Sequence, residues 1–193
     1  SAVAVYQENV KGLLAYSSVA QIGHLVLAVS FATGNDEGSV LGLSAGIVHL
    51  FNHAMIKGSL FLTMGCVMWR VGSTDLKDMK GLAKSMPWTM AAFVVAGASL
   101  VGVPGTAGFI SKWYLALGAL DGGYLWVEVV LLVSSLLNVF YLLPVAVTAF
   151  FRDRDEEEDE DGKGMKEAPW QCVVPLTCSA LGCFGLFCIS DVL

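Results

Sequence analysis

Charged residues are scarce in this sequence, and their scarcity limits the class of protein. They make up 15% of the 193 residues, against about 25% in a typical soluble domain. Eight of the seventeen acids lie in one run, Asp153–Asp161, so the net charge of −6 belongs mainly to one loop. The bases form no cluster on one face, which argues against nucleic acid as a partner.

Recognisable chemical motifs are also missing. The chain opens Ser1-Ala2-Val3, without an initiator methionine or a signal peptide, and we expect either processing or further sequence upstream. The five cysteines have neither zinc-site nor secreted-disulfide spacing, so we interpret them as packing residues. No phosphate loop, dinucleotide fingerprint or nucleophile elbow is present. We therefore expect no cofactor, no metal and no redox or hydrolytic site.

Long apolar segments fill most of the chain, which is 55% hydrophobic with a mean hydropathy of +0.67. A bilayer core is about 30 Å thick, so a spanning helix needs about 20 apolar residues. The sequence predicts an all-α integral membrane protein with five transmembrane helices. We expect spans at about residues 10–32, 41–70, 87–119 and 124–150, an acidic loop at 151–168 and a C-terminal helix within 169–193.

The positions of the bases predict the orientation of these helices. Cytoplasmic loops are enriched in Lys and Arg, and five spans place nine of the eleven bases on one side of the membrane. The loops on the other side, 33–40 and 120–123, contain no base. We therefore expect a multi-pass protein of the cell inner (plasma) membrane, with its N-terminal end in the cytoplasm and Leu193 outside. The acidic loop then faces the cytoplasm as a solvated linker.

The third span is too long to be one straight helix, because 33 residues at 1.5 Å each reach about 50 Å. It contains Gly102-Val103-Pro104-Gly105, and proline removes a backbone donor and clashes with the preceding turn. We predict two half-helices with a break near Gly102–Gly105, in the middle of the membrane, where transporters place ion sites. Two separate crossings, at 87–103 and 107–119, would move the last four bases outside, so we reject that alternative.

One face of the second span carries titratable side chains. His49, His53 and Lys57 follow one another at intervals of four residues, which places them on one side of a helix. Ionisable groups inside a bilayer are costly and usually face the bundle interior or a water path. Since His titrates near neutrality, this face predicts a proton path. A polar cluster that only fixes helix packing is the alternative.

Lys112 follows the predicted break and lies about seven residues before the short loop at 120–123, so we interpret it as an ion-path lysine. Snorkelling or a structural ion pair is the alternative. Position alone makes Lys11 an interfacial anchor at the start of the first span. Gln21 and His24 lie deeper in that span, where packing is the stronger interpretation for a lone histidine. Glu128, near the outer end of the fourth span, is a weaker candidate for ion exit.

Three segments resemble motifs of the antiporter-like subunits found in Mrp-type multisubunit Na⁺/H⁺ antiporters, respiratory complex I and membrane-bound hydrogenases. Lys11–Gly23 (KGLLAYSSVAQIG) resembles their lysine-led helix. His49–Phe61 (HLFNHAMIKGSLF) resembles their histidine-rich helix, and Gly102–Trp113 (GVPGTAGFISKW) resembles their second broken helix. Their order and separations match as well, and the resemblance covers about residues 1–150.

The resemblance implies a fourteen-helix fold with two inverted five-helix repeats, of which this chain resembles the second repeat plus the last helix. It implies proton-path roles for Lys11, His53, Lys57 and Lys112, and for His49 in some branches only. Gly12 departs from the family, which often has Arg there, and so does His24, where Tyr or Phe is usual. The first repeat is absent, so we expect the missing N-terminal half among the partners, together with other hydrophobic subunits and lipid.

Three functions remain open at this point. The leading one is a part of the D-type subunit of an Mrp antiporter, which exchanges Na⁺ for H⁺ and is not itself an enzyme. The second is a proton-pumping membrane subunit of a complex I-like NADH-quinone oxidoreductase or a membrane-bound hydrogenase. The third is a structural fragment that does not transport ions.

Overall fold

The computed structural model describes residues 1–31, 37–152 and 167–189, and these residues are helical with short connections. The acidic run Asp153–Asp161 and residues 33–36 of the expected loop lie outside the described residues, whereas residues 37–40 form the start of α3. The long helices are α2 (Val10–Phe31), α3 (Glu37–Val71), α7 (Leu125–Phe151) and α8 (Trp170–Ile189), and two shorter ones follow each other as α5 (Pro87–Val101) and α6 (Ala107–Asp121). Single-turn pieces complete the order, namely α1 (Ala2–Val5), the 3₁₀ helix η1 (Leu76–Met79) and α4 (Leu82–Ser85).

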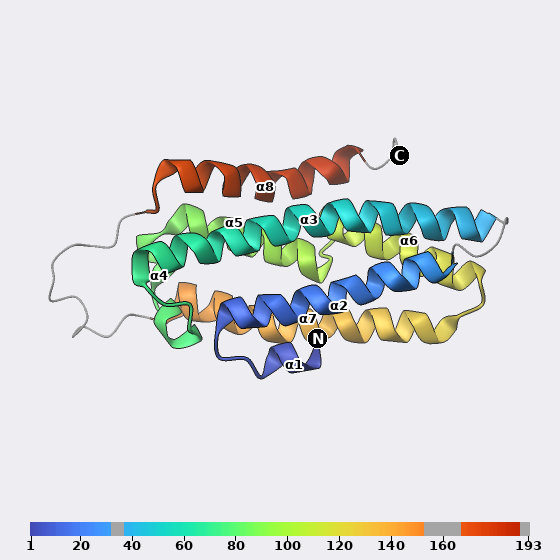
Figure 1. Cartoon of the computed structure of the whole chain (residues 1–193), viewed down its shortest axis with the longest axis horizontal. Coiled ribbons are helices and arrows are strands. Elements are labelled where there is room, and N and C mark those ends of the chain that lie inside the picture. Colours follow the sequence, from blue (N-terminus) through green and yellow to red (C-terminus); the bar gives the residue numbers. More distant parts are fainter. Residues whose placement is uncertain (32–36, 153–166, 190–193) are drawn as a thin grey trace, which may run out of the picture.

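The expected all-α membrane fold with a broken third span is confirmed. Four described helices, α2, α3, α7 and α8, are long and apolar enough to cross a membrane. Helices α5 and α6 run one after the other in the same direction, so together they make one pass (Figure 1). The alternative in which each of them crosses alone is therefore wrong.

Successive passes run in alternating directions. In Figure 1 the first residues of α2, the connection from α3 to α5 and the end of α7 lie at the left end of the bundle. Described bases gather at this end, in or beside the elements that meet there: Lys11, Arg70, Lys77, Lys80, Lys84 and Arg152. The described bases thus lie at one end of the bundle, as the orientation predicted from the sequence requires.

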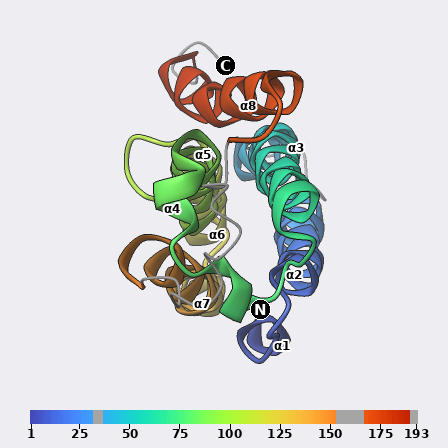
Figure 2. The same ribbon diagram turned by 90° about the vertical axis from the view of Figure 1, so that its left-hand side faces the viewer.

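The helices form two layers with α8 across one edge. Figure 2 shows α2 and α3 on one side, α5, α6 and α7 on the other, and α8 above α3 and α5. Helix α3 packs against α2, α5, α6 and α8. Because it has neighbours on so many sides, polar side chains in its middle can be buried within protein and shielded from lipid.

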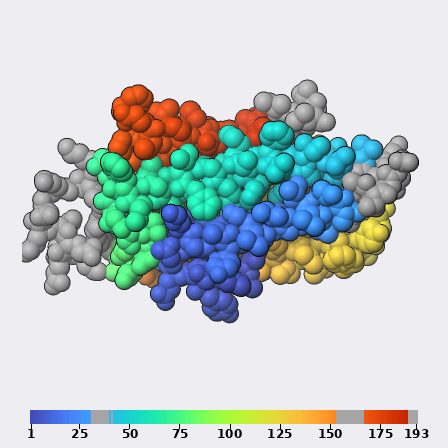
Figure 3. All heavy atoms as spheres, viewed as in Figure 1, coloured from blue at the N-terminus to red at the C-terminus, as the bar shows by residue number. Residues whose placement is uncertain are grey.

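The outer surface of the bundle is largely apolar, as expected for helices that face lipid or other subunits. Figure 3 shows the face that α8, α3 and α2 make together. Large exposed apolar side chains lie along α2, α7 and α8, among them Val19, Val26, Leu132, Phe140 and Leu181. The main internal cluster lies between α2, α3, α5 and α7 and includes Leu14, Leu60, Phe93 and Tyr141.

Candidate functional site

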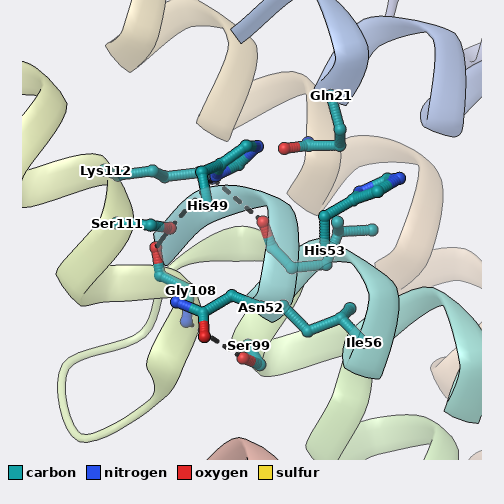
Figure 4. Close-up of a pocket in the computed structure, with 10 residues that line it drawn as sticks. Gln21, His49, Asn52, His53, Ile56, Ser99, Gly108, Ser111 and Lys112 are labelled. Carbon is teal, nitrogen blue, oxygen red and sulfur yellow. Dashed lines mark hydrogen bonds between the residues drawn. The ribbon is translucent and has the colours of Figure 1, made fainter. Parts of the chain in front are cut away.

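The polar face of α3 lies inside the bundle. His49 and Lys57 are buried and His53 is half-buried. The rings of His49 and His53 are stacked with their centroids 6.2 Å apart. Figure 4 shows these histidines close to Lys112 of α6 and Gln21 of α2. The face therefore meets polar groups from two other helices.

Helix α2 contributes a third histidine to this cluster. His24 Nδ1 lies 3.1 Å from Gln21 Oε1, and the His24 and His49 rings meet edge to face at 5.8 Å between centroids. On its other side, His49 Nδ1 lies 3.1 Å from the hydroxyl of Ser111 in α6. Gln21 and His24 thus belong to the same site as His49, although position in the sequence favoured a packing role for His24.

A small cavity of about 10 Å³ lies beside the histidines, lined by Gln21, His49, Asn52, His53, Ile56, Ser99, Leu100, Gly108, Ser111 and Lys112 (Figure 4). Such a volume is about the space that one water molecule needs. Three buried nitrogens in this region have no hydrogen-bond partner within the described part of the protein: Gln21 Nε2, His49 Nε2 and His53 Nδ1. Volume and polar lining together suit a water molecule that bridges the imidazoles.

The break between α5 and α6 is a tight turn. Gly102 ends α5 with a φ of 91°, a left-handed conformation that glycine adopts without strain. The Thr106 amide then donates to the Val103 carbonyl over 3.2 Å, with Pro104 and Gly105 between them. Gly105 has a φ of 93°. Proline followed by a glycine with positive φ is typical of a type II turn, so this sequence builds the break locally.

The break frees two carbonyl groups at the end of α5, and Lys112 binds them. Its Nζ donates to the carbonyls of Leu100 and Val101 over 2.9 and 2.8 Å, and to the Ser135 hydroxyl of α7 over 3.0 Å. An ammonium group has three protons to donate, and all three are used here. The C-terminal end of a helix carries partial negative charge, which stabilises the ammonium. The break thus supplies two of the three groups that bind the lysine predicted beside it.

Close packing holds α6 against α5 at this point. The Gly108 amide donates to Ser99 Oγ over 3.2 Å, and a Cβ at position 108 would overlap the Ser99 carbonyl. Asn52 of α3 donates to the Ala107 carbonyl over 2.7 Å. Because Asn52 lies between His49 and His53 in the sequence, this bond fixes the histidine face relative to the first turn of α6.

Lys57 is held by α2. Its Nζ donates to the Leu14 carbonyl over 3.1 Å and to Ser17 Oγ over 2.7 Å. The Ser17 hydroxyl lies 2.5 Å from the hydroxyl of Tyr141 in α7. Tyr141 donates in turn to Asn138 Oδ1 over 2.7 Å. Lys57 is therefore connected through α2 to polar side chains of α7.

Both lysines are bound by neutral groups in the described part of the chain, because their partners are backbone carbonyls and serine hydroxyls. No group of three or more His, Cys, Asp or Glu residues that could hold a metal occurs among the described residues. The arrangement can bind and release protons at two amines and three imidazoles.

Two predicted residues lie away from this cluster. Lys11 is exposed in the first turn of α2, where its amide and that of Gly12 donate to Asn9 Oδ1. Glu128 lies in the first turn of α7 at the opposite end, and its Oε1 is buried without a partner among the described residues. Neither contacts the histidines or Lys112 through a hydrogen bond that the structure describes.

Several site residues were not singled out by the sequence. Ser17, Asn52, Ser99, Ser111 and Tyr141 are all buried and bind other members of the site. Ser and Asn side chains commonly form hydrogen bonds between membrane helices, so their presence alone gave no signal. Spacing gave a partial signal, since Ser135, Asn138 and Tyr141 follow each other at intervals of three residues on α7 and so share one face of that helix.

Comparison with known proteins identifies the class. Residues 1–138 match the family described as "NADH:quinone oxidoreductase/Mrp antiporter, TM". Since this match covers most of the chain, the protein belongs to that family of antiporter-like membrane subunits. The resemblance found in the three sequence motifs is confirmed.

Individual relatives come from both branches of the family. The chain is 45% identical over 153 residues to the N subunit of NADH-quinone oxidoreductase from Desulforudis audaxviator, and 33% identical over 158 residues to the D-type subunit of the Na(+)/H(+) antiporter from Alkalihalophilus pseudofirmus. These alignments cover 79% and 81% of this chain but 29% and 31% of the relatives. The fold matches the Mrp complex from Dietzia sp. with a TM-score of 0.84 and 25% identity, over 98% of this chain and 41% of the matched one. The chain thus spans about a third of the length of its relatives.

Proposed function

We propose that this chain forms part of the proton path of an antiporter-like membrane subunit that exchanges Na⁺ for H⁺ within a multisubunit complex. One observation carries the proposal. Two lysines, Lys57 and Lys112, lie in the middle of the bundle with three histidines and a water-sized cavity beside them. Ionisable groups this deep in a membrane protein typically mark ion or proton pathways.

Each part of the site has a distinct task in this path. The lysines hold protons at fixed places, because carbonyls and hydroxyls bind their ammonium groups. The histidines exchange protons through their two ring nitrogens, and the cavity lined by His49, His53 and Lys112 has room for a water molecule between them. Lys11, exposed at the end of the bundle where the bases gather, serves as the entrance. Glu128 at the opposite end is the weaker candidate for exit.

The same arrangement supports a proposed orientation and a proposed set of partners. We place the base-rich end in the cytoplasm, which puts the N-terminal end of the chain inside and Leu193 outside the cell inner membrane. Residues 1–150 are then the translocating module, 151–168 a cytoplasmic loop and 169–193 the last transmembrane segment. The partners are the remaining part of the same subunit, other hydrophobic subunits and lipid.

The test uses the complete assembly, reconstituted into lipid vesicles with a pH-sensitive dye inside. Lys112→Ala and Lys57→Ala should each abolish Na⁺-dependent proton flux, while Lys77→Ala, an exposed lysine in η1, should leave it unchanged. Wild-type flux in either of these two lysine variants would refute the proposed path. Flux that is absent from the unaltered assembly would instead support a structural fragment.

A second function is favoured by the higher identity to the N subunit of an NADH-quinone oxidoreductase. In that case the same path would be driven by a redox reaction in other subunits, and flux would require an electron donor in place of a Na⁺ gradient. Purification of the tagged chain separates the two. Flavin and iron–sulfur subunits that copurify would support the redox-driven complex, and hydrophobic subunits alone would support the antiporter.

A further inference from the structure

A second connection joins the two lysines without touching the histidines. It runs through the side chains of Ser17, Tyr141 and Asn138, which we call the hydroxyl–amide chain. The last hydrogen bond goes from Asn138 Nδ2 to the Leu100 carbonyl over 3.2 Å. This carbonyl is also one of the three acceptors of Lys112. The chain therefore begins at the ammonium of Lys57 and ends on an atom that Lys112 shares.

Every proton in the hydroxyl–amide chain points in the same direction. The Asn138 amide nitrogen faces the Leu100 carbonyl, so its oxygen faces Tyr141 and accepts that residue's only hydroxyl proton. Tyr141 can then only accept from Ser17. The Ser17 proton is thereby directed away from Lys57, and the serine lone pair accepts from the ammonium. Because each hydroxyl donates away from Lys57, the hydroxyl–amide chain stabilises the charged form of Lys57.

The same chain cannot carry a proton from one lysine to the other. A proton that reached Asn138 Oδ1 would have to leave from Nδ2, which requires an unstable tautomer of the amide. The next acceptor is the Leu100 backbone carbonyl, which has no proton of its own to pass on. By contrast, each neutral imidazole of His24, His49 and His53 has one nitrogen that accepts a hydrogen bond and one that donates a proton.

We propose that the hydroxyl–amide chain couples the charges of Lys57 and Lys112 without conducting protons. When Lys57 gives its proton to the histidine side, its neutral amine becomes an acceptor, and the Ser17 hydroxyl turns toward it. Tyr141 then loses its donor, its bond to Asn138 weakens, and the Asn138 amide donates less strongly to the Leu100 carbonyl, which therefore binds Lys112 more strongly. Release at one lysine thus favours the charged form at the other. The inference rests on the proposed proton path and makes the three residues of the chain positioning residues within it.

Tyr141→Phe tests the coupling, because it removes the hydroxyl and keeps the ring in the core. Flux through the complete assembly is measured in vesicles across a range of pH. The titratable groups that face the chain are Lys57 and His53 of α3 and Lys112 of α6, with His49 of α3 and His24 of α2 beyond them. Tyr16→Phe is the matched control, since Tyr16 adjoins Ser17 and is 47% exposed.

We expect the maximal flux of Tyr141→Phe to stay within about threefold of wild type, and the pH midpoint of flux to fall by about half to one unit, the effect of one hydrogen bond. Without Tyr141 as acceptor, the Ser17 proton stabilises the neutral amine. Ser17→Ala should shift the midpoint in the same direction, because it removes an acceptor of the ammonium. The double variant should shift it no further than the larger single effect, since both changes break one chain.

Two outcomes would overturn the coupling. Complete loss of flux at every pH in an assembled Tyr141→Phe complex would mean that the hydroxyl itself carries protons. If the pH midpoint of flux were unchanged in both Tyr141→Phe and Ser17→Ala, the hydroxyl–amide chain would serve only to pack the helices together. The proton path is judged separately, because normal flux in Lys112→Ala would refute it whatever the chain variants show.

Discussion

Gly102 and Gly105 provide a matched pair of substitutions that isolates the position of Lys112. Both have positive φ, 91° and 93°, so alanine at either position strains the backbone to a similar extent. Their surroundings differ. A Cβ at position 102 would lie 3.1 Å from Lys112 Cδ and 3.5 Å from Nζ, whereas a Cβ at position 105 would have no such neighbour within 4 Å among the described residues. Only Gly102→Ala pushes on the lysine.

The expected magnitudes follow from these contacts. Left-handed backbone costs a residue with a Cβ about 1–2 kcal/mol, so both variants should lower the thermal stability of the assembly similarly. At position 102, carbon atoms that prefer a separation of about 3.5–4.0 Å must move apart, and the Lys112 side chain is the mobile partner. A hydrogen bond to a charged group is worth about 1.5–3 kcal/mol. Losing one at Lys112 corresponds to a flux about 10- to 100-fold lower, because each 1.4 kcal/mol is about a factor of ten.

The assay measures proton flux in vesicles per quantity of assembled complex, so that reduced assembly is not mistaken for reduced transport. Gly102→Ala should show the large loss, and Gly105→Ala should keep nearly normal flux per complex. Equal flux in the two variants, whether high or low, would show that transport does not depend on the position of the Lys112 ammonium at the end of α5.

Three further predictions concern other contacts. Asn52→Leu removes the hydrogen bond from α3 to the Ala107 carbonyl, which should cost about 0.5–1.5 kcal/mol; a thermal unfolding curve of the complex measures the loss, and an unchanged curve would contradict the role of this bond. Glu167→Ala removes the carboxylate that accepts from the Trp88 amide and the Thr89 hydroxyl at the start of α5, so limited proteolysis should release α8 faster than from wild type. Lys11→Ala should lower flux severalfold without abolishing it if this exposed lysine is an entrance, and flux equal to wild type would leave it as an interfacial anchor.

Much of the fold could be predicted from the sequence, because helices in a membrane are constrained by length and by backbone hydrogen bonding. The excess length of the third span indicated a break, and Pro104 between two glycines located it. The four-residue spacing of His49, His53 and Lys57 needed only helical geometry to place them on one face. In these cases a local pattern determined the structure.

The contacts between helices could not be predicted in the same way. Ser17 and Tyr141 are 124 residues apart in sequence, and nothing in either helix specifies that the two hydroxyls meet. For His24, burial was expected in either interpretation, and only the packing of α2 against α3 shows that it contacts His49. The site depends on which helices are neighbours, and the sequence of one chain contains little information on that.

The break between α5 and α6 also has a consequence for how the protein enters the membrane. Each half has 15 residues and is about 22 Å long, which is shorter than the hydrocarbon core of about 30 Å. The second half carries Lys112 and the first ends in carbonyls that its own helix leaves unpaired, so neither is a stable occupant of lipid on its own. Stable insertion of residues 87–121 therefore depends on α3 and α7, which supply Asn52, Ser135 and Asn138 as partners for the exposed polar groups. During biogenesis the segment that holds Lys112 is therefore stably inserted only after α7, which is synthesised later.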